Sequence, residues 1–153
     1  AQLSRGLGDV YKRQPRMRLD LLINDFTYKA LTQGYLVVYE KHFMRTFIHV
    51  HDIGRSFVFG IKNQDRMANN VFNIGSDKMN YSKEDVCELI KARTEAYVHY
   101  ADIGEDADKR NYVVSYDKIS ALGFETTISA EEGIDELIRS LNAIEFRTPY
   151  TNV

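Results

Sequence analysis

The chain has 153 residues, 44% of them apolar and 27% charged, which is the balance of an ordinary globular domain with enough residues for a core. Its net charge of only −2 excludes the strong positive field that attracts nucleic acid or an acidic membrane surface. No apolar run approaches the roughly 20 residues that span a bilayer. The single cysteine, Cys87, excludes an internal disulfide and fits a reducing compartment. We therefore expect a cytoplasmic protein that binds neither nucleic acid nor a membrane.

Residues 1–14 do not fit the pattern that follows, because they have no initiator Met and no clear periodicity. They are similar to the translated sequencing-adapter tails found at the ends of metagenomic reading frames, so we interpret them as a non-native tail outside the fold. Gly6 and Gly8 do not indicate a phosphate-binding turn, since no strand precedes them and no third glycine follows. We expect the domain to span 15–145 and the remaining residues, 146–153, to form a loose tail.

From Pro15 onward, helical and extended patterns alternate, which is typical of an α/β domain. Helices are expected to begin at Pro15, at Asp52, after Ser82, at Asp117 and after Ser129. Strands are expected at 36–39, 45–50, 71–75, 96–100 and 111–115. Polar surface loops are expected at 40–44, 63–70 and 102–109. The strands are short and scattered, so the pattern favours a small mixed sheet with helices over a complete doubly wound sheet.

Several helix ends carry local signals. Glycines predict the ends of two helices: Gly34 and Gly123. Ser82 with Asp85, and Ser129 with Glu132, have the spacing of capping boxes. Asp52 is expected to be the N-cap of the helix that follows the strand at 45–50.

Five motifs in order along the chain resemble the C-terminal half of extended short-chain dehydrogenases/reductases, and more narrowly the NAD-dependent nucleotide-sugar epimerases and dehydratases. The most specific is Arg-x-Phe-Ile-His-Val-x-Asp at 45–52. The others are Pro-Arg-Met-Arg at 15–18, the strand at 36–39, Asn-Ile-Gly at 73–75, and Lys-Arg-Asn-Tyr at 109–112 followed by Asp-Lys-Ile and Leu-Gly-Phe at 117–124. The resemblance covers essentially all of 15–145.

Two features of that family are absent from the sequence. No glycine-rich dinucleotide turn is present, and none of the ten tyrosines has a lysine four residues later, so the family's catalytic Tyr-x-x-x-Lys pair is missing. The resemblance therefore implies the C-terminal part of an extended Rossmann-type enzyme, incomplete without its NAD-binding half. It would hold a nucleotide-diphosphate sugar while NAD or NADP, bound by the missing half, supports redox chemistry, and the intact enzyme would be a homodimer. The alternative is a non-catalytic module of the same family that binds a ligand or a protein.

The resemblance also implies a set of substrate-binding residues. Arg45 would contact the diphosphate, because its guanidinium stays charged and forks onto phosphate. Further candidates line the nucleotide or face an anion: Val37, Val38, Tyr39, Asn80, Arg110, Arg16 and Arg18. On the residues alone, a surface arginine in a solvated loop is the more common interpretation of Arg45, and a turn asparagine that of Asn80. The strand at 37–39 could equally be a plain buried strand, and the arginines before residue 19 a solvated basic patch.

Two features of the loops fit the family less well. The family's Tyr-Gly-x-Gly loop before the arginine is replaced by 39–44, which contains no glycine. The acidic stretch 105–108 would repel a diphosphate, so either Lys109 and Arg110 offset it or the substrate differs.

The sequence offers little support for a metal or a nucleophile. His49 and His51 have a spacing that can chelate a metal, but Asp52 is the only further ligand nearby, so we expect no metal site. Cys87 lies beside the apolar stripe of a helix and is interpreted as a packing residue.

Overall fold

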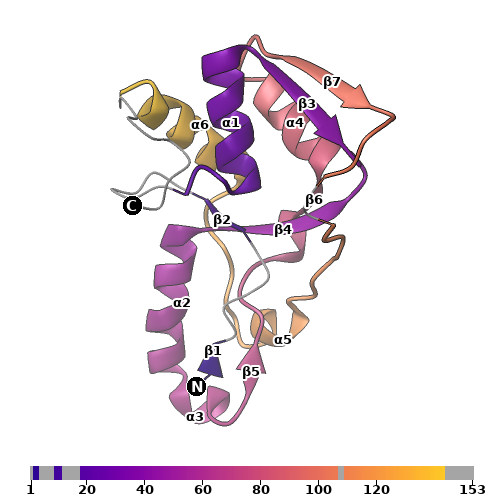
Figure 1. Ribbon diagram of the computed structural model, residues 1–153. Helices are drawn as coiled ribbons and strands as arrows, with labels where there is room; N and C mark the ends of the chain where they lie inside the picture. Colours follow the sequence, from indigo (N-terminus) through magenta and orange to yellow (C-terminus); the bar gives the residue numbers. More distant parts are fainter. Residues whose placement is uncertain (1, 4–8, 12–17, 107–108, 144–153) are drawn as a thin grey trace.

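Strand β4 (Met44–His49) crosses the middle of the molecule and separates two groups of elements (Figure 1). The structure, a computed structural model, describes residues 2–3, 9–11, 18–106 and 109–143. Every residue of β4 after Met44 is buried, so both faces of the strand are covered. Successive side chains of a strand point to opposite faces. Phe47 accordingly packs into one hydrophobic cluster and Ile48 into the other.

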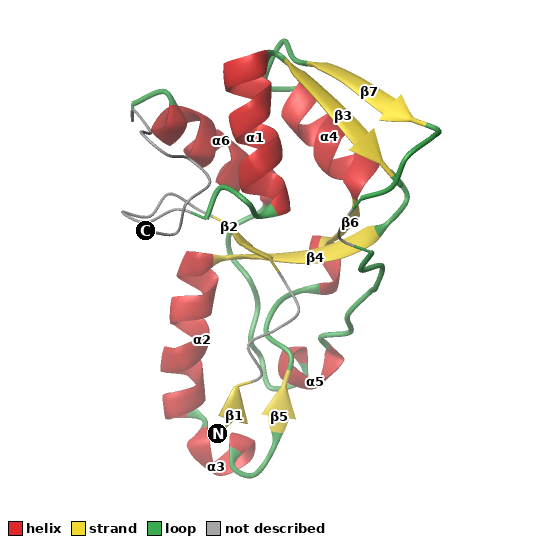
Figure 2. Ribbon diagram, viewed as in Figure 1, coloured by secondary structure: helices red, strands yellow, loops and turns green. Residues whose placement is uncertain are grey.

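The group above β4 holds the larger core. It consists of α1 (Leu22–Gln33), α4 (Lys83–Lys91), α6 (Ala130–Leu141) and a ribbon of two parallel strands, β3 (Tyr35–Tyr39) and β7 (Tyr97–Ala101) (Figure 2). The three helices bury their apolar faces against one another and against Phe47. Ile23, Val86 and Ile134, one from each helix, are completely buried there.

The group below β4 is built on α2 (Val50–Lys62), with the short helices α3 (Gln64–Met67) and α5 (Asp117–Ser120) and strand β5 (Val71–Phe72). Met67, Phe72 and Ile119 fill its core with Ile48 of β4. None of the helices in the described part of the chain is long and apolar enough to cross a membrane.

Short strand pairings complete the architecture. β1 (Gln2–Leu3) pairs in parallel with β5, and β2 (Asp9–Tyr11) pairs in parallel with β4. β6 (Asn80–Ser82), which follows a 3-10 turn at Asp77–Met79, pairs antiparallel with β4. The expected fold class, an α/β domain with a small mixed sheet and helices, is confirmed.

The local helix signals are largely confirmed. Both capping boxes form, with the Ser82 hydroxyl accepting from the Asp85 amide and the Ser129 hydroxyl accepting from the Glu132 amide. Gly34 follows α1 with a φ of 73°, the left-handed conformation that glycine adopts without steric cost.

The predicted role of Asp52 is wrong. α2 begins at Val50, and its N-cap is His49, whose side chain accepts from the His51 amide. Asp52 lies in the first turn and is completely buried. Its carboxylate accepts hydrogen bonds from the amides of Thr127 and Ile128, so it ties α2 to the segment before α6.

Other element boundaries also differ from the expectation. Residues 111–115 do not form a regular strand, because the Val114 amide donates to the Asn80 side chain and the Tyr112 amide donates to the Met44 carbonyl. The expected strand at 71–75 is shortened to Val71–Phe72, and the expected loop at 63–70 contains α3. α1 begins at Leu22, so residues 18–21 are not helical, and Pro15, where the helix was expected to begin, lies outside the described residues.

The segment 1–14 was expected to lie outside the fold. Its five described residues instead form β1 and β2, which pair with β5 and β4. The foreign origin of this segment stays a prediction.

Candidate functional site

Arg45 lies at the second position of β4, beneath the segment that precedes α5. It is only 1% exposed, and its Nη1 donates to the Met44 carbonyl at 3.0 Å. The guanidinium carbon lies 5.8 Å from the centre of the Tyr112 ring. Segment 111–112 is fixed over it, because the Met44 amide donates to Asn111 Oδ1 at 2.8 Å and the Tyr112 amide donates to the Met44 carbonyl at 3.2 Å. The arginine is therefore enclosed between a strand and a loop.

Asn80 lies beside Arg45 on the neighbouring strand β6, where it pairs with Thr46 of β4. Its side-chain amide donates to the carbonyls of Asp77 and Val114, and its Oδ1 accepts from the Val114 amide. The Tyr116 hydroxyl, 2.6 Å from Thr46 Oγ1, adds a further link between this segment and β4. Asn80 thus holds the 111–116 segment in place through its whole amide group.

The candidate residues of β3 point in two directions. Val37 is 44% exposed, whereas Val38 is buried in a cluster with Leu36 and Cys87, as the alternation of a strand requires. Tyr39 ends the strand, and its ring packs directly against the backbone of Gly104, where a Cβ would collide with Tyr39 Cε1 and Cδ1. Cys87 is fully buried, and burial raises the pKa of its thiol to about 12, so the packing role predicted for it is confirmed.

The sequence analysis missed Lys83, the first residue of α4. Its side chain is 1% exposed, and its Nζ donates to Asp106 Oδ2 at 2.7 Å and to the Tyr39 carbonyl at 3.1 Å. The ammonium also lies 5.5 Å from the centre of the Phe43 ring. The signal that could have revealed it is its position, because a cation in the first turn of a helix opposes the helix dipole and so needs another reason to be there.

The remaining basic candidates lie at the surface or outside the described residues. Arg110 is exposed, and its neighbour Lys109 forms ion pairs with Glu40 at 3.4 Å and Glu105 at 2.6 Å. Arg18 is exposed and donates from two nitrogens to the Asp20 carboxylate, which holds the pKa of Asp20 below its ordinary value. Arg16 lies outside the described residues. The structure therefore places Arg45 and Asn80 against segment 111–116, and Tyr39 against Gly104.

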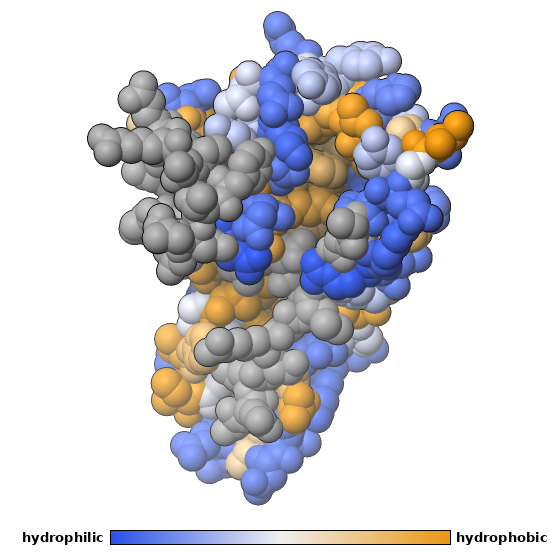
Figure 3. Space-filling view, in the orientation of Figure 1, coloured by the Kyte–Doolittle hydropathy of each residue, from blue (hydrophilic) through white to orange (hydrophobic). Residues whose placement is uncertain are grey.

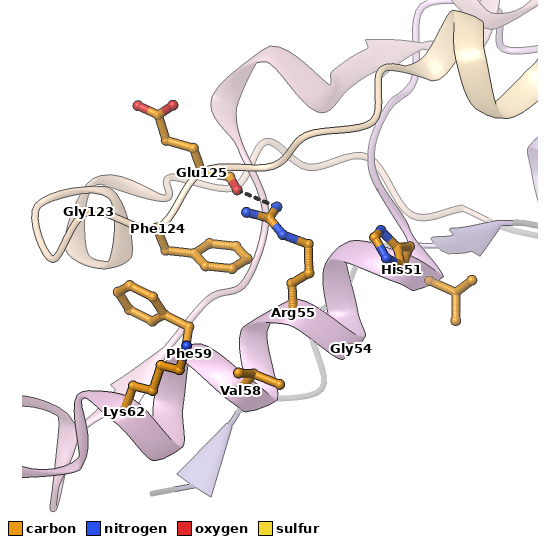
Figure 4. A pocket seen from close by; sticks show the side chains of 10 residues that line it. His51, Gly54, Arg55, Val58, Phe59, Lys62, Gly123, Phe124 and Glu125 are labelled. Atoms are coloured by element: carbon orange, nitrogen blue, oxygen red, sulfur yellow. Dashed lines mark hydrogen bonds between the residues drawn. The ribbon is translucent and has the colours of Figure 1, made fainter.

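A separate groove lies along α2. It has a volume of about 640 Å³ and an apolar floor that includes Val58, Phe59 and Phe124 (Figure 4). Arg55 reaches across it and donates to the Glu125 carbonyl at 3.0 Å. The rings of Phe59 and Phe124 meet edge to face, with centroids 5.3 Å apart. Arg45 does not line this groove.

Two buried cations lie close to tyrosines: Arg45 beside the Tyr112 ring, and Lys83 on the Tyr39 carbonyl. Charge-assisted hydrogen bonds from such cations can hold an anionic group. Among the described residues, no group of three or more His, Cys, Asp or Glu side chains could hold a metal ion. His49 instead contacts Glu136 through Nε2 at 3.3 Å.

No family model matches the chain, but its fold is shared with solved nucleotide-sugar enzymes. The UDP-glucose 4-epimerase of Thermus thermophilus, solved with NAD, matches 92% of this chain at a TM-score of 0.65 and 16% identity. The UDP-glucuronic acid 4-epimerase of Bacillus cereus, solved with UDP-glucuronic acid and NAD, matches 87% at a TM-score of 0.68 and 19% identity. The GDP-mannoheptose C4 reductase of Campylobacter jejuni, solved with NADP, matches 89% at a TM-score of 0.64 and 18% identity.

These similarities show that the fold of this chain is that of part of the three solved enzymes. The matched regions cover 45%, 43% and 48% of those three chains, so this chain spans less than half of their length.

Proposed function

We propose that this chain is the substrate-binding portion of an NAD(P)-dependent nucleotide-sugar epimerase, dehydratase or reductase. In this proposal it holds the nucleotide diphosphate and so positions the sugar, while a dinucleotide-binding portion carries out the redox chemistry. The observation that carries the proposal is Arg45, which lies in the motif at 45–52 and at the base of the loops that surround it, within a fold shared with enzymes of this kind.

The residues of this chain do not fit a bound NAD or NADP. A dinucleotide pyrophosphate needs glycines where a strand turns into a helix, so that backbone amides can approach it. The described junction from β4 to α2 reads His49-Val50-His51, and the junction from β6 to α4 reads Ser82-Lys83-Glu84. Neither contains glycine. We therefore assign the cofactor to another part of the enzyme and derive no catalytic step from this chain.

The test is equilibrium binding of UDP, dTDP, GDP and CDP to the chain and to an Arg45→Lys variant. Lysine keeps the charge but loses the planar fork, so we expect binding to weaken by about tenfold or more. Arg45→Ala should abolish it. Because Arg45 is buried, circular dichroism must show that each variant is folded. If the folded Arg45→Lys and Arg45→Ala variants bind as tightly as the unaltered chain, Arg45 is not the diphosphate contact.

If the chain binds nucleotides of one base more tightly than the others, that base defines the substrate class. The three solved enzymes named above are named for UDP sugars or a GDP sugar. The roles proposed for the other candidates depend on the same binding site. Tyr39 and Val37 would contact the base, with the backbone of Val38 beside them, and Asn80 and Arg110 would lie near the diphosphate. The basic residues 16 and 18 stay candidates for a more distant part of the ligand. The finer assignments to isomerase or lyase activity, a cytoplasmic location and a homodimeric intact enzyme also remain proposals.

A second function, a non-catalytic binding module, is favoured by one observation. The acidic residues Glu105 and Asp106 lie among the cations of the site and engage Lys109 and Lys83. If none of the four nucleotides binds, this reading replaces the first. An open reading frame upstream of Pro15 that encodes a glycine-rich turn and Tyr-x-x-x-Lys would support the enzyme, and a genuine start codon there would support the module.

A further inference from the structure

The buried ammonium of Lys83 joins three segments that are far apart in the sequence. Its Nζ donates to the carbonyl of Tyr39 at the end of β3 and to the carboxylate of Asp106 beyond β7. Its backbone amide donates to the Phe43 carbonyl at 3.1 Å, just before β4. Figure 1 shows the end of β3 and the start of β4 close to the start of α4. Lys83 therefore links the end of β3, the residues that follow β7 and the residue that precedes β4.

The position of Lys83 is costly for the fold alone. Lysine is among the residues that are least often fully buried. The free-energy cost of removing its charge from water is offset only where close partners interact with the ammonium. The first turn of α4 adds the unfavourable end of the helix dipole. The partners that compensate are an ion pair of 2.7 Å with Asp106, the Tyr39 carbonyl and the face of the Phe43 ring.

The contact with Asp106 closes the acidic loop 102–106 onto Tyr39. Gly104 has a φ of 119° and lies against the Tyr39 ring without room for a side chain. Glycine is the residue that adopts this conformation readily, so the loop reaches the ring through bare backbone. Asp106, whose side chain is 36% exposed, secures the loop two residues later.

We propose that Lys83 is a positioning residue of the nucleotide-diphosphate site: it holds loop 102–106 closed over Tyr39, and this closure sets how long a bound nucleotide stays. The inference rests on the proposed function, which supplies the nucleotide. Lys83 acts through the loop and the end of β3, so its loss should change the rate at which ligand leaves more than the rate at which it arrives. It also gives the acidic loop a role, because the carboxylate that would repel a diphosphate is neutralised by Lys83.

The experiment uses the full 153-residue chain and compares Asp106→Asn, Lys83→Met and Lys83→Arg. Asp106→Asn keeps the shape of the side chain and removes the charge at a partly exposed position, so the fold should tolerate it. The matched control is Glu105→Gln, which removes the neighbouring carboxylate that pairs with Lys109 instead of Lys83. The double variant of Asp106→Asn with Lys83→Met tests whether the two residues act as a pair.

The first measurement is amide hydrogen exchange of 102–106 without ligand. We expect exchange about tenfold faster in Asp106→Asn and in Lys83→Met, the effect expected for losing a hydrogen bond to a charged group, with the double variant no faster than the singles. Glu105→Gln should leave exchange unchanged, and Lys83→Arg should restore most of the protection that Lys83→Met loses. Unchanged exchange in Asp106→Asn would overturn the proposal.

The second measurement is stopped-flow dissociation of a fluorescent UDP or GDP analogue, whichever binds more tightly. Dissociation about tenfold faster in Asp106→Asn and in Lys83→Met, with association within a factor of about two, supports the proposal. Faster exchange with an unchanged dissociation rate would overturn the role of Lys83 in binding while leaving the proposed function intact. Absence of nucleotide binding by the unaltered protein would instead overturn the proposed function, and with it the role of Lys83 toward a nucleotide.

Discussion

At the scale of single residues, the turn between β3 and β4 contains a left-handed backbone conformation at a residue that is not glycine. Glu40 directly follows Tyr39 and has a φ of 51°, a left-handed conformation that costs a residue with a side chain roughly 1 kcal/mol. The Phe43 amide donates to the Glu40 carbonyl and closes the turn. Segment 39–44, which contains no glycine, thus still forms a turn with a left-handed residue, the conformation that glycine adopts most readily.

This strain predicts a difference between two substitutions. Both Glu40→Gly and Glu40→Ala remove the contact with Lys109, but only glycine relieves the left-handed strain. We expect the glycine variant to be more stable than the alanine variant by about 0.5–1 kcal/mol, as measured by urea denaturation. Equal stabilities of the two variants would mean that the turn relaxes around residue 40.

Asp52 predicts a pH dependence of stability. Burial raises its pKa, but hydrogen bonds from Arg55, Thr127 and Ile128 outweigh that effect, so the folded-state pKa lies below the ordinary 3.8. A lowered pKa means that the charged carboxylate stabilises the fold above pH 3.8 and that this contribution is lost as the pH falls through the folded-state value.

We therefore expect Asp52→Asn to cost roughly 2 kcal/mol at pH 7, because the neutral amide replaces a carboxylate that accepts several buried hydrogen bonds. The cost should shrink as the pH falls below 3.8 toward the folded-state pKa, because the carboxylate is protonated first in the unfolded chain and then in the folded protein. Thermal unfolding of both proteins between pH 7 and pH 3 would measure this. A cost that stays constant with pH would show that the charge of Asp52 is not what stabilises the fold.

At the scale of elements, capping boxes fix the starts of α4 and α6, two of the helices that surround the larger core. Ser129 is the N-cap of α6: its hydroxyl accepts from the Glu132 amide at 3.2 Å, and its amide donates to the Glu132 carboxylate at 2.9 Å. Helix α6 then buries Ile134 and Leu137 against α1 and α4. A local signal thus decides where a long apolar face begins.

We expect Ser129→Ala to lower the free energy of unfolding by about 1 kcal/mol, because the helix loses its N-cap acceptor. Ser120→Ala, at an exposed serine that ends α5, is the matched control and should change stability little. Chemical denaturation of both variants is the measurement. Equal effects at the two serines would contradict a specific role of the cap.

At the scale of the whole molecule, α2 presents an uncovered apolar face. Phe57, Val58 and Ile61 are 53%, 52% and 77% exposed, and the 640 Å³ groove runs beside them. Hydrophobic surface is visible over this part of the molecule in Figure 3. Under the proposed function this face is where the dinucleotide-binding portion docks, since the matched enzymes are more than twice as long as the region that this chain covers.

The exposed face predicts self-association of the isolated chain. Ile61→Lys should reduce the concentration-dependent increase in mass seen by light scattering, because it places a charge in the centre of the apolar face. Val113→Lys, at an exposed apolar residue away from α2, is the control and should leave association unchanged. Monomeric behaviour of the unaltered chain at high concentration, with cooperative unfolding at high temperature, would contradict the prediction.

The sequence predicted the elements better than the site. Periodicity located α1 and α2, and capping boxes located the starts of α4 and α6, because the groups that form those signals lie within a few residues of each other. Arg45 was recognised from its motif, but the motif did not predict that it is 1% exposed under segment 111–112. The expected strand at 111–115 failed for a related reason, since its amides find partners on Met44 and Asn80 instead of a regular ladder.

The sequence by itself determined the α/β class, the capping boxes of α4 and α6 and the glycine that ends α1, because these depend on groups that lie close together in the chain. Only the tertiary structure decided what the buried polar groups do. Asp52 meets Thr127 across 75 residues of sequence, and Lys83 meets Tyr39 across 44. A buried charge is stable only where distant segments bring its partners within hydrogen-bond reach, so its role follows from the folded arrangement and not from its neighbours in the chain.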